Sequence, residues 1–244
     1  MPEFLYGRRA VLEALRAQRA IEKIFILRDA NLRGALGELI AAAQKNHIVV
    51  QDVPREKLDA VARDHQGVVA QVAAYQYASV EELLAVAHTR GEPAFLLLLD
   101  AVQDPQNFGT LLRTAEAVGI HGVIIAERRA VGVTAAVVKA SAGAVEHLKI
   151  ARVTNLARTI EELKRANVWV IGLENDPRAQ ELSRVDFSGA LALVLGNEGA
   201  GLHRLVREQC DFLLRVPMWG KIESLNVAVA GSLVLYHARL QRSG

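Results

Sequence analysis

The sequence predicts an α/β protein whose parallel strands alternate with helices, and three observations carry this prediction. Several segments repeat apolar residues at helical spacing. Between them lie short, wholly apolar runs such as Phe95–Leu99 and Leu191–Leu195. Polar or glycine-rich segments follow several of these runs. Strands that are apolar on both faces are typical of parallel sheets covered by helices.

Residues 1–75 are predicted to form a small α/β domain. Pro54 suits an early helix position, and Gly67 precedes a strand-like run. The expected helices are 7–18, 32–45 and 55–62, and the expected strands are 23–27, 48–53 and 68–74. Residues 76–93 are more polar, with one short helical pattern at 80–87, and are interpreted as a linker.

Residues 94–244 are predicted to form a second, largely parallel α/β domain. The expected strands are 95–99, 123–126, 168–173 and 191–195, and the expected helices are 108–118, 135–140, 156–166 and a closing helix from about residue 224. In open parallel sheets, ligands bind where the strands end at their carboxyl side. The polar segments that follow the strands are therefore the first candidates for a functional site.

Composition excludes several classes of protein. A hydrophobic content of 51% is ample for a buried core, and no apolar run approaches the roughly 20 residues that span a bilayer. With no secretory signal visible, we expect a soluble cytoplasmic protein without membrane contact. The single cysteine, Cys210, is interpreted as a core residue, and the seven scattered histidines predict no metal site. A net charge of +2 does not by itself indicate nucleic-acid binding.

The first candidate segment runs from a strand into a helix and contains Asn107 and Arg113. Arg113 projects away from the apolar stripe of that helix. Taken alone, Asn107 is interpreted as a helix cap and Arg113 as a solvated residue paired with Glu116.

The second segment, 196–201, follows a strand and precedes a helix expected near Leu202. Glycines allow a backbone to approach a ligand closely, and a helix amino terminus offers free N–H groups. The spacing is GxxGxG rather than GxGxxG, which disfavours a dinucleotide site.

The third segment, 216–231, comprises a strand end, a turn and the start of an apolar helix. Ser224 is predicted to be the N-cap of that helix. Asn226 is harder to explain structurally, because it stands in an otherwise apolar helix start. Trp219 offers a stacking surface for a base, although an aromatic residue in a turn more often covers a core.

Together these segments resemble the three motifs of SpoU-type RNA 2'-O-ribose methyltransferases of the SPOUT superfamily. The motifs are NFGTLLRTAEAVG at 107–119, LVLGNEGAGL at 193–202 and VPMWGKIESLNVAVA at 216–230, in the family's order. LYGRRAVLEAL at 5–15 and HQGVVA at 65–70 also resemble the guanosine-2'-O-methyltransferases of bacterial 23S ribosomal RNA.

The resemblance implies a ribosomal-protein-like RNA-binding domain at 1–75 and a catalytic domain with a deep trefoil knot at 94–244. It also implies S-adenosylmethionine as the cofactor, without a metal, and a homodimer. In the family's pattern the cofactor is held by backbone groups, which here correspond to Gly196, Val216 and Leu225. The catalytic set corresponds to Asn107, Arg113, Glu198, Ser224 and Asn226. These types suit methyl transfer, which needs an aligned hydroxyl and help in removing its proton.

The expected substrate is a guanosine in the peptidyl-transferase region of 23S rRNA, as free RNA or within an assembling large ribosomal subunit. Candidate RNA contacts are Arg8, Arg9, Arg16 and Arg19, although solvated helix charges are the commoner fate of such residues. Three alternatives stay open: 2'-O-methylation of tRNA, a non-catalytic RNA-binding or ribosome-assembly module, and a nucleotide-dependent oxidoreductase. The last would bind a dinucleotide in place of S-adenosylmethionine.

Overall fold

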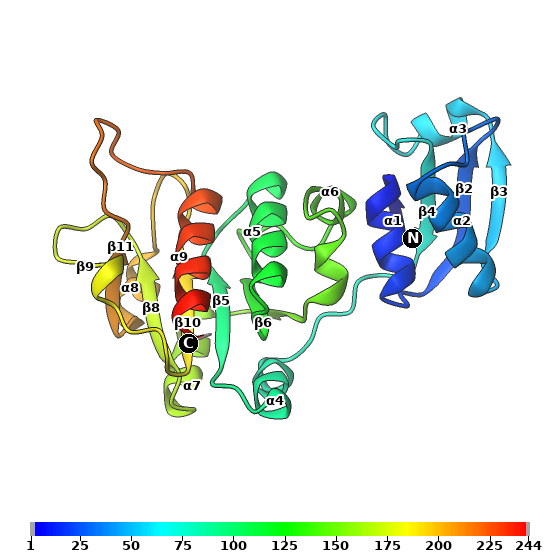
Figure 1. Cartoon of the computed structure of the whole chain (residues 1–244). Helices are drawn as coiled ribbons and strands as arrows, with labels where there is room; N and C mark the ends of the chain where they lie inside the picture. The colour runs from blue at the N-terminus through cyan, green and yellow to red at the C-terminus, as the bar shows by residue number, and fades with distance from the viewer. Residues whose placement is uncertain (1–2, 243–244) are drawn as a thin grey trace. The chain divides into compact units, whose positions relative to one another are not determined.

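The computed structural model describes residues 3–242, whose elements divide between two units. Unit 1 contains Met1–Gln76 and Val133–His147, and unit 2 contains Tyr77–Gly132 and Leu148–Gly244. Both units combine helices with a sheet, as the sequence predicts (Figure 1).

Unit 1 has a four-stranded sheet in the order β1-β4-β2-β3. Strands β2 and β3 are parallel, and the other two pairs are antiparallel. Its elements are β1 (Glu3–Tyr6), α1 (Arg8–Arg16), β2 (Ile21–Leu27), α2 (Ala35–Lys45), β3 (Val49–Val53), α3 (Arg55–Asp59), β4 (Val68–Val72), α6 (Ala135–Ala140) and the 3₁₀ turn η1 (Ala144–His147). Strand β1 was not predicted, because four residues are too few to establish a period of two. Gly7 turns the chain from β1 into α1 at a φ of 95°, which glycine adopts readily.

Unit 2 is built on a parallel sheet in the order β7-β6-β5-β10-β8-β11-β9. Its strands are β5 (Phe95–Leu99), β6 (Gly122–Ala126), β7 (Ile150–Val153), β8 (Trp169–Leu173), β9 (Gln180–Glu181), β10 (Leu191–Leu195) and β11 (Phe212–Arg215). Its helices are α4 (Val80–Arg90), α5 (Pro105–Ala117), α7 (Leu156–Arg165), η2 (Leu182–Arg184), α8 (Arg204–Gln209) and α9 (Val227–Arg242). The predicted parallel sheet is confirmed. Strands β5 and β10 pair at its centre and are buried throughout.

Helices cover both faces of this sheet. Helices α4, α7 and α8 share one apolar cluster with side chains from β5, β6, β8 and β10. On the other face α5 packs against α9 (Figure 1). Gly231 of α9 lies so close to the sheet that a Cβ atom there would come within 2.5 Å of Leu195 and 2.7 Å of Leu111. Among the described residues, no helix is long and apolar enough to cross a bilayer.

The strand order reverses at the centre of the sheet. After β5 the chain adds β6 and β7 on one side, and it later places β10, β8 and β11 on the other. Open α/β sheets bind ligands at such a reversal, beyond the carboxyl ends of the strands.

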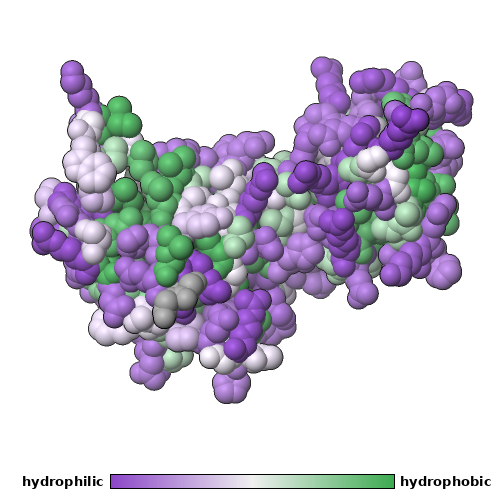
Figure 2. All heavy atoms as spheres, viewed as in Figure 1, coloured by the Kyte–Doolittle hydropathy of each residue, from purple (hydrophilic) through white to green (hydrophobic). Residues whose placement is uncertain are grey.

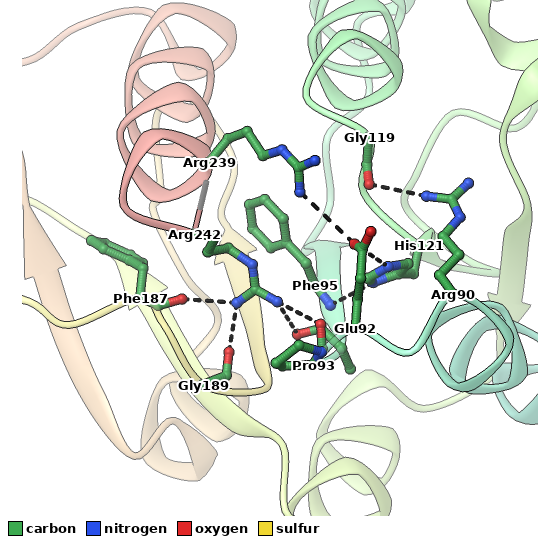
Figure 3. Close-up of polar contacts among 11 residues, drawn as sticks. Arg90, Glu92, Pro93, Phe95, Gly119, His121, Phe187, Gly189, Arg239 and Arg242 are labelled. Carbon is green, nitrogen blue, oxygen red and sulfur yellow. Dashed lines mark hydrogen bonds and ion pairs between the residues drawn. The ribbon is translucent and has the colours of Figure 1, made fainter. Parts of the chain in front are cut away.

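At the opposite, amino-terminal edge of the sheet, Arg242 fixes the end of α9 (Figure 3). Its guanidinium donates to the backbone carbonyls of Phe187 at 2.8 Å, Gly189 at 2.6 Å and Pro93. The guanidinium also lies 5.0 Å from the centre of the Phe95 ring. One side chain thus joins the last turn of α9 to segments that precede β5 and β10.

His121 is buried next to Glu92 in the same region (Figure 3). Its Nδ1 accepts the backbone N–H of Phe95 at 2.9 Å, so the ring donates from Nε2 to Glu92 at 3.2 Å. Burial lowers the pKa of His121 and the Arg90 charge adds to this, whereas Glu92 opposes both. Folding therefore favours the neutral form of the His121 ring over the charged form.

Candidate active site

The three motif segments meet at the carboxyl ends of β5, β10 and β11. A cavity of about 340 Å³ lies there, within unit 2. Gly196, Val216 and Leu225, the residues expected to hold a cofactor, all line it. Glu198 and Ser224 line the same cavity. Its volume falls in the range of small-molecule sites.

The glycine-rich loop is closed on itself. Asn197 and Gly201 exchange two backbone hydrogen bonds of 2.9 and 3.0 Å, and the Asn197 side chain donates to the carbonyl of Ala101 at 3.0 Å. The loop passes so close to Gly196 that a Cβ there would lie 2.3 Å from the carbonyl carbon of Gly201. Glycine at 196 is therefore required by packing alone.

The helix after this loop begins later than predicted. Helix α8 starts at Arg204 rather than near Leu202, and it has only six residues. Its N-cap residue, His203, donates its backbone N–H to Asp100 at 2.7 Å and places Nδ1 2.9 Å from the other oxygen of that carboxylate. Asp100 is only 5% exposed. Asp100 therefore occupies the backbone N–H of the N-cap residue at this helix start.

Three of the five predicted catalytic residues contact one another. The Asn107 side chain donates to Glu198 Oε1, and Asn226 Nδ2 donates to the same oxygen at 3.0 Å. Asn226 Nδ2 also lies 3.0 Å from Asn107 Oδ1. Two amide donors thus fix one oxygen of Glu198, which orients its second oxygen.

The helix caps differ from the prediction in an informative way. Asp104, not Asn107, caps α5 by accepting the Asn107 backbone N–H at 2.8 Å. This leaves the Asn107 side chain free to reach Glu198. Asn226, not Ser224, precedes α9, and its Oδ1 accepts the backbone N–H of Ala228 at 2.9 Å. Asn226 therefore uses its oxygen for the helix and its nitrogen for the cluster.

The other two predicted catalytic residues are not hydrogen-bonded to this cluster. Arg113 is exposed on α5 and does not line the cavity. Among the described residues it has neither a hydrogen bond nor an ion pair, so the predicted pairing with Glu116 is absent. Ser224 lines the cavity with an exposed side chain.

The sequence analysis missed the segment that follows β8. Glu174 and Asn175 line the cavity, and Asn175 donates to the backbone carbonyl of Glu223 at 2.6 Å. Arg207 of α8 holds this segment through Glu174, at 2.8 Å, and Asp176. Their position directly after a buried strand was the available signal.

The four arginines proposed as RNA contacts divide into two pairs. Arg8 and Arg9 line a cavity of about 810 Å³ in unit 1, to which Arg55 and Arg63 also contribute. Arg8 donates to the backbone carbonyl of Gln66 at 3.0 Å. This cavity carries an excess of positive charge.

Arg16 and Arg19 are engaged in ion pairs instead. Arg16 contacts Glu13 at 2.8 Å and Glu38 at 3.4 Å. Arg19, whose side chain is 9% exposed, contacts Glu146 at 2.7 Å. The buried ion pair with Glu146 occupies the Arg19 side chain, whereas the Arg16 side chain remains 54% exposed.

The possible metal ligands and the single cysteine, Cys210, bear on metal and thiol chemistry. Within residues 3–242, no cluster of three or more His, Cys, Asp or Glu side chains could hold a metal ion. Burial raises the pKa of Cys210 to about 12, which keeps its thiol protonated. Cys210 packs against an apolar core cluster.

Two family models match the chain. The SpoU rRNA Methylase family matches residues 94–236, and a model for RNA 2'-O ribose methyltransferase substrate binding matches residues 4–78. A TrmH family tRNA/rRNA methyltransferase of Bacillus subtilis is 46% identical over 242 residues, covering 99% of this chain and 96% of the relative.

Solved structures resemble the whole chain or a large part of it. The SpoU methyltransferase AviRb from Streptomyces viridochromogenes, in complex with AdoMet, has a TM-score of 0.80 at 26% identity and covers 99% of this chain and 91% of its own. An AdoMet-bound rRNA methyltransferase from Sinorhizobium meliloti has a TM-score of 0.78 at 25% identity, covering 98% and 87%. A TrmH/SpoU tRNA modifying enzyme from A. aeolicus has a TM-score of 0.57 at 25% identity, covering 67% and 83%.

Proposed function

Because the chain belongs to the SpoU rRNA methylase family and is an RNA methyltransferase, we propose that it methylates the ribose 2'-hydroxyl of a guanosine in the peptidyl-transferase region of 23S rRNA. The methyl donor is S-adenosylmethionine. The observation that carries the proposal is the convergence of Asn107, Glu198 and Asn226 beside a cavity lined by Gly196 and Leu225.

The cavity fits S-adenosylmethionine. Gly196, Gly199 and Gly201 bring the loop backbone to the cavity wall without side chains, and Leu173, Leu195 and Leu225 add an apolar lining. Such a lining suits the adenine ring and the aliphatic part of the methionine chain. When bound, the cofactor supplies a methyl group on a positively charged sulfur. AviRb, which resembles this chain over nearly its whole length, is crystallised with the same cofactor.

The side chains act on the hydroxyl rather than on the methyl group. Glu198 is an acceptor, and Asn107 and Asn226 both donate to its Oε1. Its Oε2 then accepts a hydrogen bond from the ribose 2'-hydroxyl and orients the nucleophilic oxygen toward the cavity. Arg113 is exposed on α5, and we assign its guanidinium, whose planar donors suit phosphate oxygens, to a phosphate of the RNA.

Coverage of the chain favours rRNA over tRNA as the substrate. The structural neighbours named as rRNA methyltransferases match both units, whereas an enzyme that modifies tRNA at C/U34 matches only 62% of this chain while covering 98% of its own. Unit 1, with Arg8 and Arg9 lining a cationic cavity, then selects the RNA. Arg19 acts mainly within the fold of that unit through its buried pair with Glu146, whereas the exposed Arg16 remains a candidate RNA contact.

A homodimer is proposed from the surface of α9. Val229, Leu233, Tyr236 and Leu240 expose between 48% and 73% of their surface and follow one another at helical spacing. Figure 2 shows hydrophobic residues gathered over this helix. A second copy of the chain would bury this stripe, so light scattering should return twice the chain mass of 26.5 kDa. A stable monomer at micromolar concentration contradicts the dimer.

The path of the chain around the cavity also agrees with the trefoil knot that we propose for unit 2. Strand β10 enters between β5 and β8, and β11 then returns beside β8.

Deletion of residues 1–75 should leave cofactor binding intact and abolish site-selective modification. We further propose that the enzyme works in the cytoplasm on free 23S rRNA or on an assembling large subunit.

The decisive experiment compares ribosomal RNA from cells with and without the protein by nucleoside mass spectrometry. We expect loss of one 2'-O-methylguanosine from 23S rRNA. Loss of a methyl group from tRNA instead would overturn the substrate and leave the reaction intact. Calorimetry in the presence of a chelator should detect S-adenosylmethionine binding, and recovery of binding only on adding a divalent ion would refute the metal-free site.

Arg113→Ala separates catalysis from cofactor binding. We expect methyl transfer to fall by about 100-fold, because the ribose loses a contact that positions it, while the Kd for S-adenosylmethionine changes by less than a few-fold. Arg165→Ala is the matched control, because Arg165 is also an exposed helix arginine, 78% exposed, far along the chain from the motifs. Near-normal turnover of Arg113→Ala would support a non-catalytic role for that residue. An RNA-binding module without activity predicts no transfer by the wild type.

A further inference from the structure

The loop 216–226, between β11 and α9, exposes two large apolar side chains. Trp219 is 92% exposed and Ile222 is 65% exposed. In Figure 1 this orange loop projects from unit 2. A turn aromatic that covers a core would be buried, so that explanation of Trp219 fails. Exposure of a tryptophan ring to water is unfavourable, and a partner that covers the ring in the working state would gain this free energy.

The loop is anchored to the reaction cavity at both ends. Val216 and Met218 line the cavity before Trp219, and Glu223 and Ser224 line it afterwards. Asn175 further fixes the loop by donating to the backbone carbonyl of Glu223 at 2.6 Å. Trp219 is therefore displayed at the rim of the cavity, one residue beyond a side chain of its lining.

We propose that Trp219 is a stacking platform for an unpaired RNA base at or beside the target nucleotide. The inference rests on the proposed function, because a ribose that presents its 2'-hydroxyl to the cavity must bring its own base and its neighbours to the rim. Proteins recognise unstacked RNA bases by stacking them on aromatic rings. Lys221, exposed two residues further on, supplies a positive charge for the adjoining phosphate.

A second copy of the chain is the rival occupant of this loop. Exposed Lys221 and Glu223 flank Ile222, so the apolar surface here is small and interrupted by charge. Stable protein interfaces bury about 800 Å² on each partner. The continuous stripe on α9 suits a second chain better, and this leaves Trp219 to RNA.

The chain offers its own fluorescent reporter, because its only two tryptophans are Trp169 and Trp219. Trp169→Phe leaves Trp219 as the sole emitter. Trp219→Phe leaves Trp169, which begins β8 at the opposite edge of the sheet and is 60% exposed. The probe is an unmodified transcript of the peptidyl-transferase region of 23S rRNA. We expect the transcript to quench Trp219 and to leave Trp169 unchanged.

Kinetics then test what the ring contributes. Trp219→Ala should raise the KM for RNA by about 10- to 100-fold, the range expected for one lost stacked base, and leave the Kd for S-adenosylmethionine within twofold. Trp219→Phe should retain most of the affinity, whereas Trp219→Leu should not. Calorimetry of the cofactor with each variant confirms that the loop is still folded.

The outcomes are distinguishable. Equal quenching of both reporters, no quenching, or an unchanged KM in Trp219→Ala overturns the inference. Emission from Trp219 that shifts with protein concentration in the absence of RNA, together with dissociation of Trp219→Ala in sedimentation, assigns the loop to a second copy instead. If the transcript quenches Trp219 but wild-type protein transfers no methyl group either to the transcript or to assembling large subunits, the proposed function fails and the stacking site stands.

Discussion

Gly196→Ala is the sharpest test of the cavity, because it adds one methyl group where the backbone leaves no room. Gly196 follows β10 and lines the cavity, and the returning loop passes over it. An alanine Cβ at this position would lie 2.3 and 2.4 Å from the carbonyl carbon and oxygen of Gly201 and 2.5 Å from the nitrogen of Leu202. All three contacts are backbone atoms, so no side chain can rotate away.

The magnitude follows from these distances. Carbon contacts relax to about 3.5 Å, so the loop must move by about 1 Å. Overpacking of this kind costs about 1–3 kcal/mol. If the strain falls on the folded state, Tm drops by about 2–4 °C for each kcal/mol in a protein of this size. If the loop opens to relieve it, the cavity is reshaped and S-adenosylmethionine binds about 5- to 100-fold more weakly.

Calorimetric titration and thermal unfolding measure both effects on the same sample. Gly189→Ala is the matched control, because a Cβ at Gly189 meets no atom within 4 Å and its φ is not positive. We expect the control to bind and unfold like the wild type. A Gly196→Ala protein with unchanged Tm and unchanged cofactor affinity would refute the close packing of this loop and the place of the cofactor beside it.

Three further predictions concern the described contacts. Asn226→Ser should keep the α9 cap, with Tm within about 2 °C, yet lose methyl transfer because serine lacks the bridging amide. Arg242→Met should lower the free energy of unfolding by about 1–3 kcal/mol in urea titrations, because the backbone carbonyls of Phe187, Gly189 and Pro93 lose their shared charged donor. Burial, and then Arg90, lowers the pKa of His121 in the folded state despite Glu92, so the unfolded state binds more protons. The contribution of His121 to the free energy of unfolding is therefore fully present above about pH 6.5 and is lost as the pH falls below that value. His121→Gln should flatten that loss, and an unchanged pH profile contradicts it.

Strands that are buried on both faces were the easiest elements to predict. Phe95–Leu99 and Leu191–Leu195 match β5 and β10 at both ends, because five consecutive apolar residues leave no competing pattern. Strands β7 and β9 were missed. Strand β7 is four residues long and includes exposed Arg152, and β9 has only two residues, held by pairing with β11. Their extended conformation depends on a neighbouring strand, which a local pattern does not contain.

The site was predictable as a set of segments and less so as a set of contacts. Motif spacing selected Asn107, Glu198 and Asn226, which the fold brings together although 119 positions separate the first and last. The contacts of Arg207 with Glu174 and Asp176 could not be predicted from a sequence motif, because they join α8 to a loop that carries none. Long-range ion pairs depend on the strand order, and that order follows from the whole chain.

The structure shows why the cap interpretations of Asn107 and Ser224 were wrong. A residue such as Asn at a helix start has two uses, since its oxygen can accept a backbone N–H and its nitrogen can donate elsewhere. At α5 these duties are divided: Asp104 caps the helix and Asn107 reaches Glu198. At α9 the single residue Asn226 performs both. Helix formation therefore positions the amide that orients Glu198, and the rigidity of α9 is transmitted directly to the carboxylate that we assign to the ribose hydroxyl.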